Sequence, residues 1–118
     1  MLAHGAVLRK NFFTAEQLIS IVRDYRHAGL EPDEVAVMAY AEKIALQANS
    51  VTPQDIDELR SHGLTDVEIL DVALAASARN FFSKALDGVG AEPDAAYLDL
   101  EPELRAVLVK GRPFDGNK

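Results

Sequence analysis

The chain has 118 residues, of which 48% are hydrophobic, and this composition is typical of a folded domain with a core. Its formal net charge is −7 and its basic residues are scattered, so we expect no nucleic-acid partner, since a phosphate backbone would be repelled. No apolar run approaches the roughly 20 residues of a membrane span, and the sequence predicts a cytoplasmic protein without a membrane partner.

The first half of the chain contains clear helix start and stop signals. A first helix is expected over residues 2–10, where two basic residues at the end complement the negative pole of the helix dipole. Thr14 and Gln17 form a capping-box pattern for a second helix, which Gly29 ends.

The third and fourth helices are predicted from prolines at their starts. Pro32 is followed by two acids, and this order suits the first turn of a helix. The third helix has a wide apolar stripe and a narrow polar side, so we expect it to be largely buried. Thr52 and Pro53 begin a short fourth helix, which Gly63 ends.

The longest helix is expected over residues 66–87, after a capping-box pattern at Thr65 and Glu68. One apolar stripe on it comprises Val67, Leu70, Leu74, Ala78, Phe81, Phe82 and Ala85. A second stripe comprises Ile69, Val72, Ala73 and Ala76. A helix that is apolar nearly all round is buried on most sides, and a small domain has few helices to cover it. We therefore expect a homo-oligomer that forms through the helix 66–87.

The remainder of the chain follows a turn-rich link. Residues 102–110 are expected to form a last short helix, and residues 111–118 a flexible tail. No stretch has the alternation that is typical of a strand. The sequence thus predicts an all-α fold, with one compact domain of about five helices over residues 1–110 and helix packing between subunits.

The sequence offers few groups for catalysis. It contains no cysteine, which excludes disulfides, thiolate metal sites and a cysteine nucleophile among these residues. The three histidines, His4, His27 and His62, lie far apart and show no zinc-motif spacing. We therefore expect no metal site and no cofactor. His27 and His62 lie beside helix-ending glycines, where a cation is favourable, and Asn80 is expected to bond to a neighbouring helix or lie at an edge.

The stretch YAEKIALQANSVTPQDIDELRSHGLTDVEILDVALAASARNFFSKALDGVGAEPD, from Tyr40 to Asp94, resembles the alkylhydroperoxidase-D-like family of the carboxymuconolactone decarboxylase superfamily, in particular its peroxidase-related branch. The features that carry the resemblance are YAEK, VTPQDIDELRSHGLTDVEILD and NFFSKALDGVGAEPD, and the opening AHGAVLRK fits the same family. The resemblance implies an all-helical, oligomeric protein. The active members of this family reduce hydroperoxides through a C-x-x-C-x-x-x-H motif and an upstream glutamate.

By this resemblance, His4 is the histidine of the motif and would act as a proton relay. The second cysteine of the motif would stand immediately before Met1, at a position that the sequence does not have. We expect that the sequence is short at its N-terminus, and a thiol reductant partner is implied only for a longer form that carries the cysteines. A shortened relative that keeps the helical scaffold for another role is the competing explanation.

Three functions follow as expectations. The first is a peroxidase-related protein that is inactive as a thiol peroxidase in this form, because it lacks both redox cysteines. The second is a non-catalytic helical scaffold or interaction protein that assembles as an oligomer. The third is a cysteine-independent enzyme similar to carboxymuconolactone decarboxylase.

Overall fold

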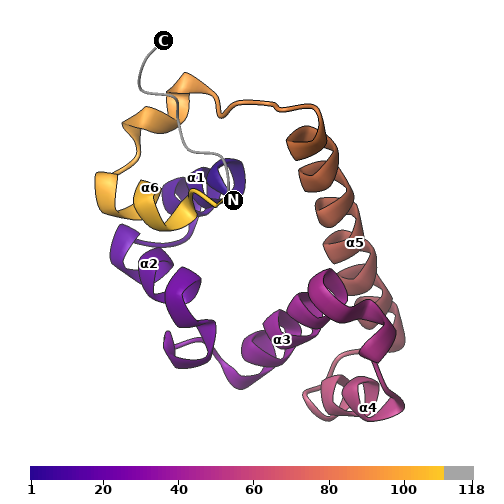
Figure 1. Cartoon of the computed structure of the whole chain (residues 1–118). Helices are drawn as coiled ribbons and strands as arrows, with labels where there is room; N and C mark the ends of the chain where they lie inside the picture. Colours follow the sequence, from indigo (N-terminus) through magenta and orange to yellow (C-terminus); the bar gives the residue numbers. More distant parts are fainter. Residues whose placement is uncertain (111–118) are drawn as a thin grey trace. The chain divides into compact units, whose positions relative to one another are not determined.

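The computed structural model describes residues 1–110, and every regular element within them is helical (Figure 1). The α-helices are α1 (Leu2–Asn11), α2 (Ala15–Asp24), α3 (Pro32–Gln47), α4 (Pro53–Ser61), α5 (Asp66–Gly88) and α6 (Pro102–Leu108). Short 3-10 helices cover Tyr25–His27, Ala48–Ser50 and Ala95–Asp99. The all-α prediction is confirmed, and the six α-helices of this range correspond to the six helices predicted in chain order, one more than the predicted total of about five. The predicted tail 111–118 lies outside the described residues.

The starts of three α-helices follow the predicted capping signals. Thr14, Thr52 and Thr65 each accept a hydrogen bond from the backbone N–H three residues later, and a side chain at that position bonds back to the cap. Gly29 and Gly63 have φ values of 76° and 90°, a left-handed conformation that ends the helical turns before them and that only glycine adopts without strain.

The chain divides into two compact units by its internal contacts. Unit 1 comprises Met1–Gly29 and the segment that begins at Ala91, and unit 2 comprises Leu30–Gly90. The single domain over residues 1–110 stays a prediction.

Unit 1 has a small leucine core that α1, α2 and α6 share. Its buried members are Leu2, Leu18, Leu104 and Leu108. The side chain of Leu108 lies directly against Gly5 of α1, where a Cβ atom would stand 2.5 Å from Cδ1 and 2.8 Å from Cδ2. The glycine therefore allows α1 and α6 to approach closely. Near this contact Arg9 reaches the carboxylate of Glu101, with 2.6 Å between Nη2 and Oε1.

Unit 2 consists of α3 packed against α5, with α4 against both helices. Its buried apolar side chains are Leu59 on α4, at 1% exposure, and Ile69 on α5, at 5%. Lys43 of α3 donates a hydrogen bond of 2.7 Å to Asp55 of α4, which links these two helices. This unit therefore combines a small apolar core with one ion pair between helices.

The structure corrects the predicted burial of α3. None of its residues is buried, and the apolar side chains of Met38 and Leu46 are exposed. Within unit 2, α4 and α5 are the α-helices that pack against α3, and they cover one side of it. The wide apolar stripe therefore exceeds the surface that these two helices can bury.

Candidate functional site

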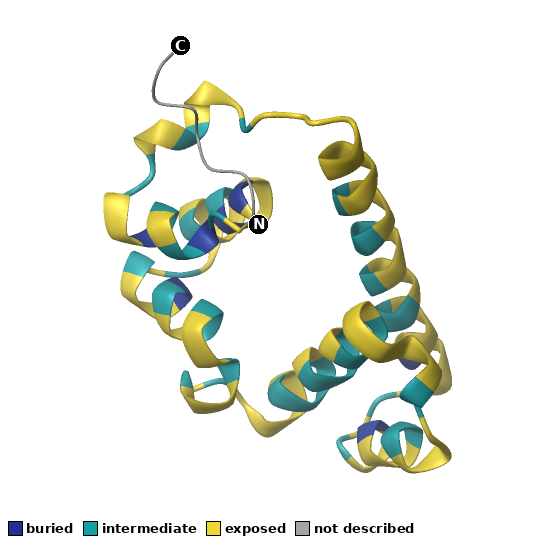
Figure 2. Cartoon of the chain, in the orientation of Figure 1, coloured by how far each residue is buried: buried dark blue, intermediate teal, exposed yellow. Residues whose placement is uncertain are grey.

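The two apolar stripes of α5 lie on different sides of the helix, as the spacing of 3.6 residues per turn requires. The second stripe includes the buried Ile69, and its other members, Val72, Ala73 and Ala76, are half-buried. The first stripe is exposed along its whole length, and Figure 2 shows exposed residues along most of α5. We call this stripe the α5 outer face: Val67, Leu70, Leu74, Ala78, Phe81, Phe82 and Ala85.

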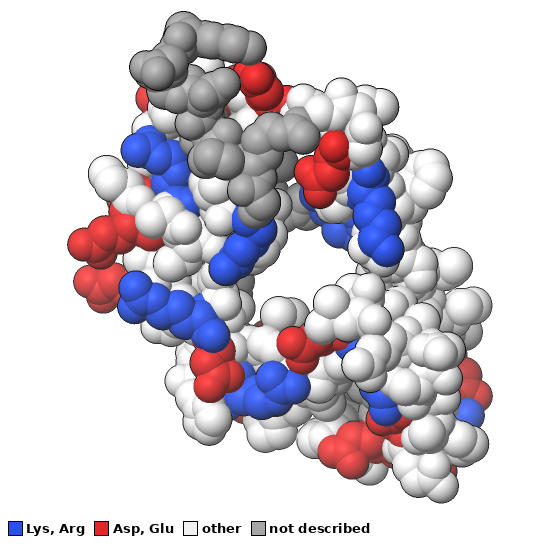
Figure 3. Space-filling view, in the orientation of Figure 1, with Lys and Arg blue, Asp and Glu red and all other residues white. Residues whose placement is uncertain are grey.

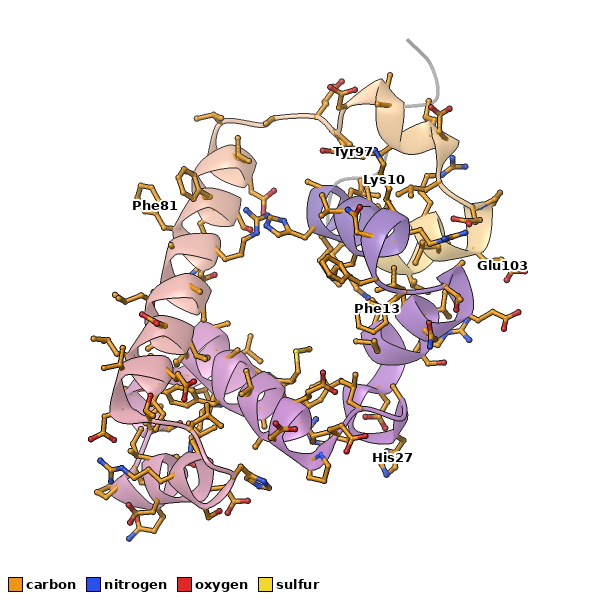
Figure 4. The ribbon with its side chains drawn as sticks, turned by 180° about the vertical axis from the view of Figure 1, so that it is seen from behind. Lys10, Phe13, His27, Phe81, Tyr97 and Glu103 are labelled. Carbon is orange, nitrogen blue, oxygen red and sulfur yellow. The ribbon has the colours of Figure 1, made fainter. Side chains whose placement is uncertain are left out.

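Large side chains make the α5 outer face strongly apolar. Their exposures are 68% for Val67, 57% for Leu70, 58% for Leu74, 68% for Phe81 and 57% for Phe82. The two phenylalanine rings meet edge to face, with 5.5 Å between their centroids, and Phe81 points outward from α5 (Figure 4). If each of these five side chains offers on the order of 100 Å² of apolar surface, the face amounts to about 500 Å², which is the size of the largest apolar patches on monomers, and such patches are often binding sites.

The charges of α5 are separated along its length. Acidic residues predominate in its first half, namely Asp66, Glu68 and Asp71, whereas the basic residues stand in its second half, namely Arg79 and Lys84. Asp87 in the last turn is the exception. Figure 3 shows the surface over α5 as largely uncharged on the side in view. By the helical period, Asp71 is the charged residue that lies within the α5 outer face, between Ala78 and Phe82.

Local hydrogen bonds keep two of these acids ionised. Arg60 donates a hydrogen bond of 2.8 Å to Asp66, and this bond holds the pKa of the Asp66 carboxyl below its ordinary value. The backbone N–H of Thr65 donates to Glu68 at 2.7 Å and likewise lowers the pKa of that carboxyl. The first turn of α5 is therefore negative at neutral pH.

The structure does not gather the histidines into one site. His4 is exposed on α1, His27 bonds through Nδ1 to Asp24 at 2.6 Å, and His62 lies 3.4 Å from Glu58 in unit 2. Among residues 1–110, no cluster of three His, Asp or Glu side chains could hold a metal ion. The predicted relay function of His4 stays a prediction, since the structure neither supports nor contradicts it.

Asn80 interacts with the neighbouring helix. Its Nδ2 donates to the carbonyl oxygen of Ala45 on α3 at 3.5 Å, which is a long hydrogen bond, and this agrees with the structural interpretation of the residue. Asn80 therefore faces α3 and does not belong to the α5 outer face.

The carboxylate of Asp55 has an environment that was not predicted from the sequence. One carboxylate oxygen, Oδ2, accepts hydrogen bonds from Lys43 Nζ at 2.7 Å, from Thr52 N at 2.7 Å and from Thr52 Oγ1 at 3.0 Å. These bonds lower the pKa of Asp55 to about 2, and the bond from Lys43 has the largest effect on this pKa. The sequence shows only that Asp55 stands in the first turn of a predicted helix, where an acid is favoured by the helix dipole. The partner Lys43, on the preceding helix, could be found only from the fold.

No helix within residues 1–110 combines the length and the hydropathy that a membrane crossing requires. Comparisons with family models, with characterised proteins and with solved structures give no significant match. The resemblance to the alkylhydroperoxidase-D-like family therefore rests on the sequence pattern alone.

Proposed function

We propose that this chain is a self-associating helical protein, in which the α5 outer face forms the interface with a second copy. The observation that carries this proposal is the exposure of the first stripe, whose large side chains are 57–68% exposed although they are apolar. Burial of this surface is favourable because apolar area is removed from water. This proposal is the second of the three expected functions, a non-catalytic helical scaffold or interaction protein. A cytoplasmic location is part of the proposal.

The size of the face indicates a moderate affinity. Two copies would bury on the order of 1,000 Å² through their large side chains, which lies near the lower limit for specific interfaces. Association also costs translational freedom and side-chain entropy. We therefore expect a dimer with a dissociation constant in the micromolar range.

Sedimentation equilibrium across a micromolar concentration series tests the proposal. We expect the wild-type chain to pass from monomer to dimer, and Leu74→Glu to stay monomeric, because it places a charge in the centre of the face. Leu46→Glu is the matched control, since Leu46 is also an exposed leucine of unit 2, at 75%, but lies on α3. A monomeric wild type, or equal loss of association in both variants, would overturn the proposal.

Membership of the alkylhydroperoxidase-D-like family is a second proposal, supported by the resemblance of residues 40–94. The chain has no cysteine, so its own residues hold no thiolate to attack a peroxide oxygen. We expect no dithiol-dependent reduction of an organic hydroperoxide by the purified chain. Measurable turnover would contradict this expectation, whereas turnover of a lactone would favour the cysteine-independent alternative.

A further inference from the structure

We infer that two copies of α5 pair antiparallel, in a register that places Asp71 and Asp66 of one copy beside Arg79 and Lys84 of the other. This inference rests on the proposed self-association and adds its orientation and register. The observation behind it is the separation of charge along α5, with three acids before residue 72 and, apart from Asp87 in the last turn, only bases from residue 79 on.

The positions of the charges around α5 agree with this arrangement. At 100° per residue, Asp71 lies within the α5 outer face, between Ala78 and Phe82, and Arg79 lies further round on the same side of the helix. Asp66 and Lys84 flank the face on the other side. In an antiparallel pair, each flank of one helix faces the same flank of its partner. Each acid therefore meets a base on its own side of the contact.

Both ion pairs require one register. The midpoint between residues 71 and 79 is Ala75, and the midpoint between residues 66 and 84 is also Ala75. A two-fold axis beside Ala75 therefore aligns both pairs at the same time, and four ion pairs form in the dimer. Asp66 is 74% exposed, so its carboxylate is accessible to Lys84 of the second copy while it accepts from Arg60.

The apolar residues pack in nearly the same register. With the axis at residues 75–76, Leu70 lies opposite Phe81, Val67 opposite Ala85, and Leu74 opposite Ala78. Large side chains thus face small ones in two of the three layers, which allows the helices to approach closely. The axis positions that the charges and the apolar layers require differ by at most one residue, which shifts facing residues by at most two residues, or about 3 Å along the helix.

A parallel pair would be disfavoured by the same residues. In register, it would place the acidic first half of α5 beside the acidic first half of its partner and the basic residues of both copies at the same level, and like charges at such positions repel. It would also align the two helix dipoles, whereas an antiparallel pair sets opposite poles side by side. Electrostatics therefore favours the antiparallel orientation.

Cysteine cross-linking tests the orientation cleanly because the chain has no cysteine of its own. Val67→Cys and Ala85→Cys are made separately, mixed and mildly oxidised. In the antiparallel dimer the two positions lie within about 3 Å along the axis, whereas two copies of residue 67 lie about 25 Å apart, beyond the reach of a disulfide. We expect a cross-link between the two variants and none within either variant alone.

The outcomes separate this inference from the proposed function. Links within each single variant, with dimers in sedimentation, would overturn the antiparallel orientation and leave self-association standing. Dimers without any cross-link would also overturn it. A monomeric wild type would overturn both proposals.

Charge exchange provides an independent measurement of the register. Asp71→Arg and Arg79→Asp should each weaken the dimer about tenfold, because each places like charges together twice. The double exchange restores both pairs and should return the dissociation constant to within about twofold of the wild-type value. A double variant as weak as the single ones would overturn the inferred register, since a parallel pair offers no such compensation.

Discussion

The contact between Gly5 and Leu108 gives the sharpest stability prediction for unit 1. Gly5→Ala would place its Cβ atom 2.5 Å from Cδ1, 2.8 Å from Cδ2 and 3.2 Å from Cγ of Leu108. Rotation of the two methyl groups cannot relieve this overlap, because the branching carbon is also close. The whole side chain must move, and it is 2% exposed within the leucine core.

Two opposing effects set the size of the change. Alanine favours a helix interior over glycine by about 1 kcal/mol. Insertion of a methyl group into a packed core costs about 1–3 kcal/mol. We therefore expect Gly5→Ala to lower the free energy of unfolding of unit 1 by about 0–2 kcal/mol, with the gain in helix propensity masking part of the overlap.

A double-mutant cycle with Leu108→Ala isolates the overlap. Leu108→Ala alone should cost about 2–5 kcal/mol, because it leaves a cavity in the core. In that background the methyl group of Gly5→Ala has space, so the same substitution should stabilise by about 1 kcal/mol. Gly5→Ala is thus neutral or destabilising when residue 108 is leucine and stabilising when residue 108 is alanine. The coupling energy between the two substitutions is about 1–3 kcal/mol.

Urea unfolding and amide hydrogen exchange measure these effects, and exchange in α1 and α6 reports on unit 1 separately. Gly88→Ala is the control, since it also replaces a glycine in a helix but its Cβ meets nothing within 4 Å. Equal stabilisation by Gly5→Ala in both Leu108 backgrounds would refute the reasoning.

Three further predictions concern unit 2. The pKa of Asp55 is about 2, below its ordinary 3.8, so the stability from its bonds should be complete above about pH 4 and lost as the pH falls through 2. Asp55→Asn should remove this part of the acid dependence, and an unchanged pH profile of urea unfolding would contradict it. Leu59→Ala should cost about 2–5 kcal/mol of unfolding free energy, since this leucine is 1% exposed; a loss below about 1 kcal/mol would show that the site collapses. Thr65→Ala should cost about 1 kcal/mol and speed hydrogen exchange in the first turn of α5, whereas Thr65→Ser should not.

Helix starts and ends were predictable because their signals are local. Thr14, Thr52 and Thr65 cap helices through a residue three positions away, so the sequence contains the whole interaction. Gly29 and Gly63 act through their own backbone conformation. The short helix Ala95–Asp99 was not predicted, because its cap, Asp94, stands at the end of a turn-rich link.

Contacts between distant residues were not predictable from the sequence. The sequence shows a glycine in the first helix and a leucine in the last, but nothing in it indicates that they touch. In the same way, Asp55 is recognisable as a helix-start acid, whereas Lys43 as its partner depends on the packing of α4 against α3. The burial of α3 was overestimated because an apolar pattern shows what a helix can bury, and only its neighbours decide how much it does bury.

The long helix shows the same division between sequence and tertiary structure. Its residue spacing alone determined that α5 would carry two apolar stripes, because the helical period assigns each residue to a side. Only the tertiary structure decided that the stripe with Ile69 packs within unit 2 and that the stripe from Val67 to Ala85 stays exposed. The physical reason is that both stripes favour burial, and the packing of α3 and α4 covers only one side of the helix.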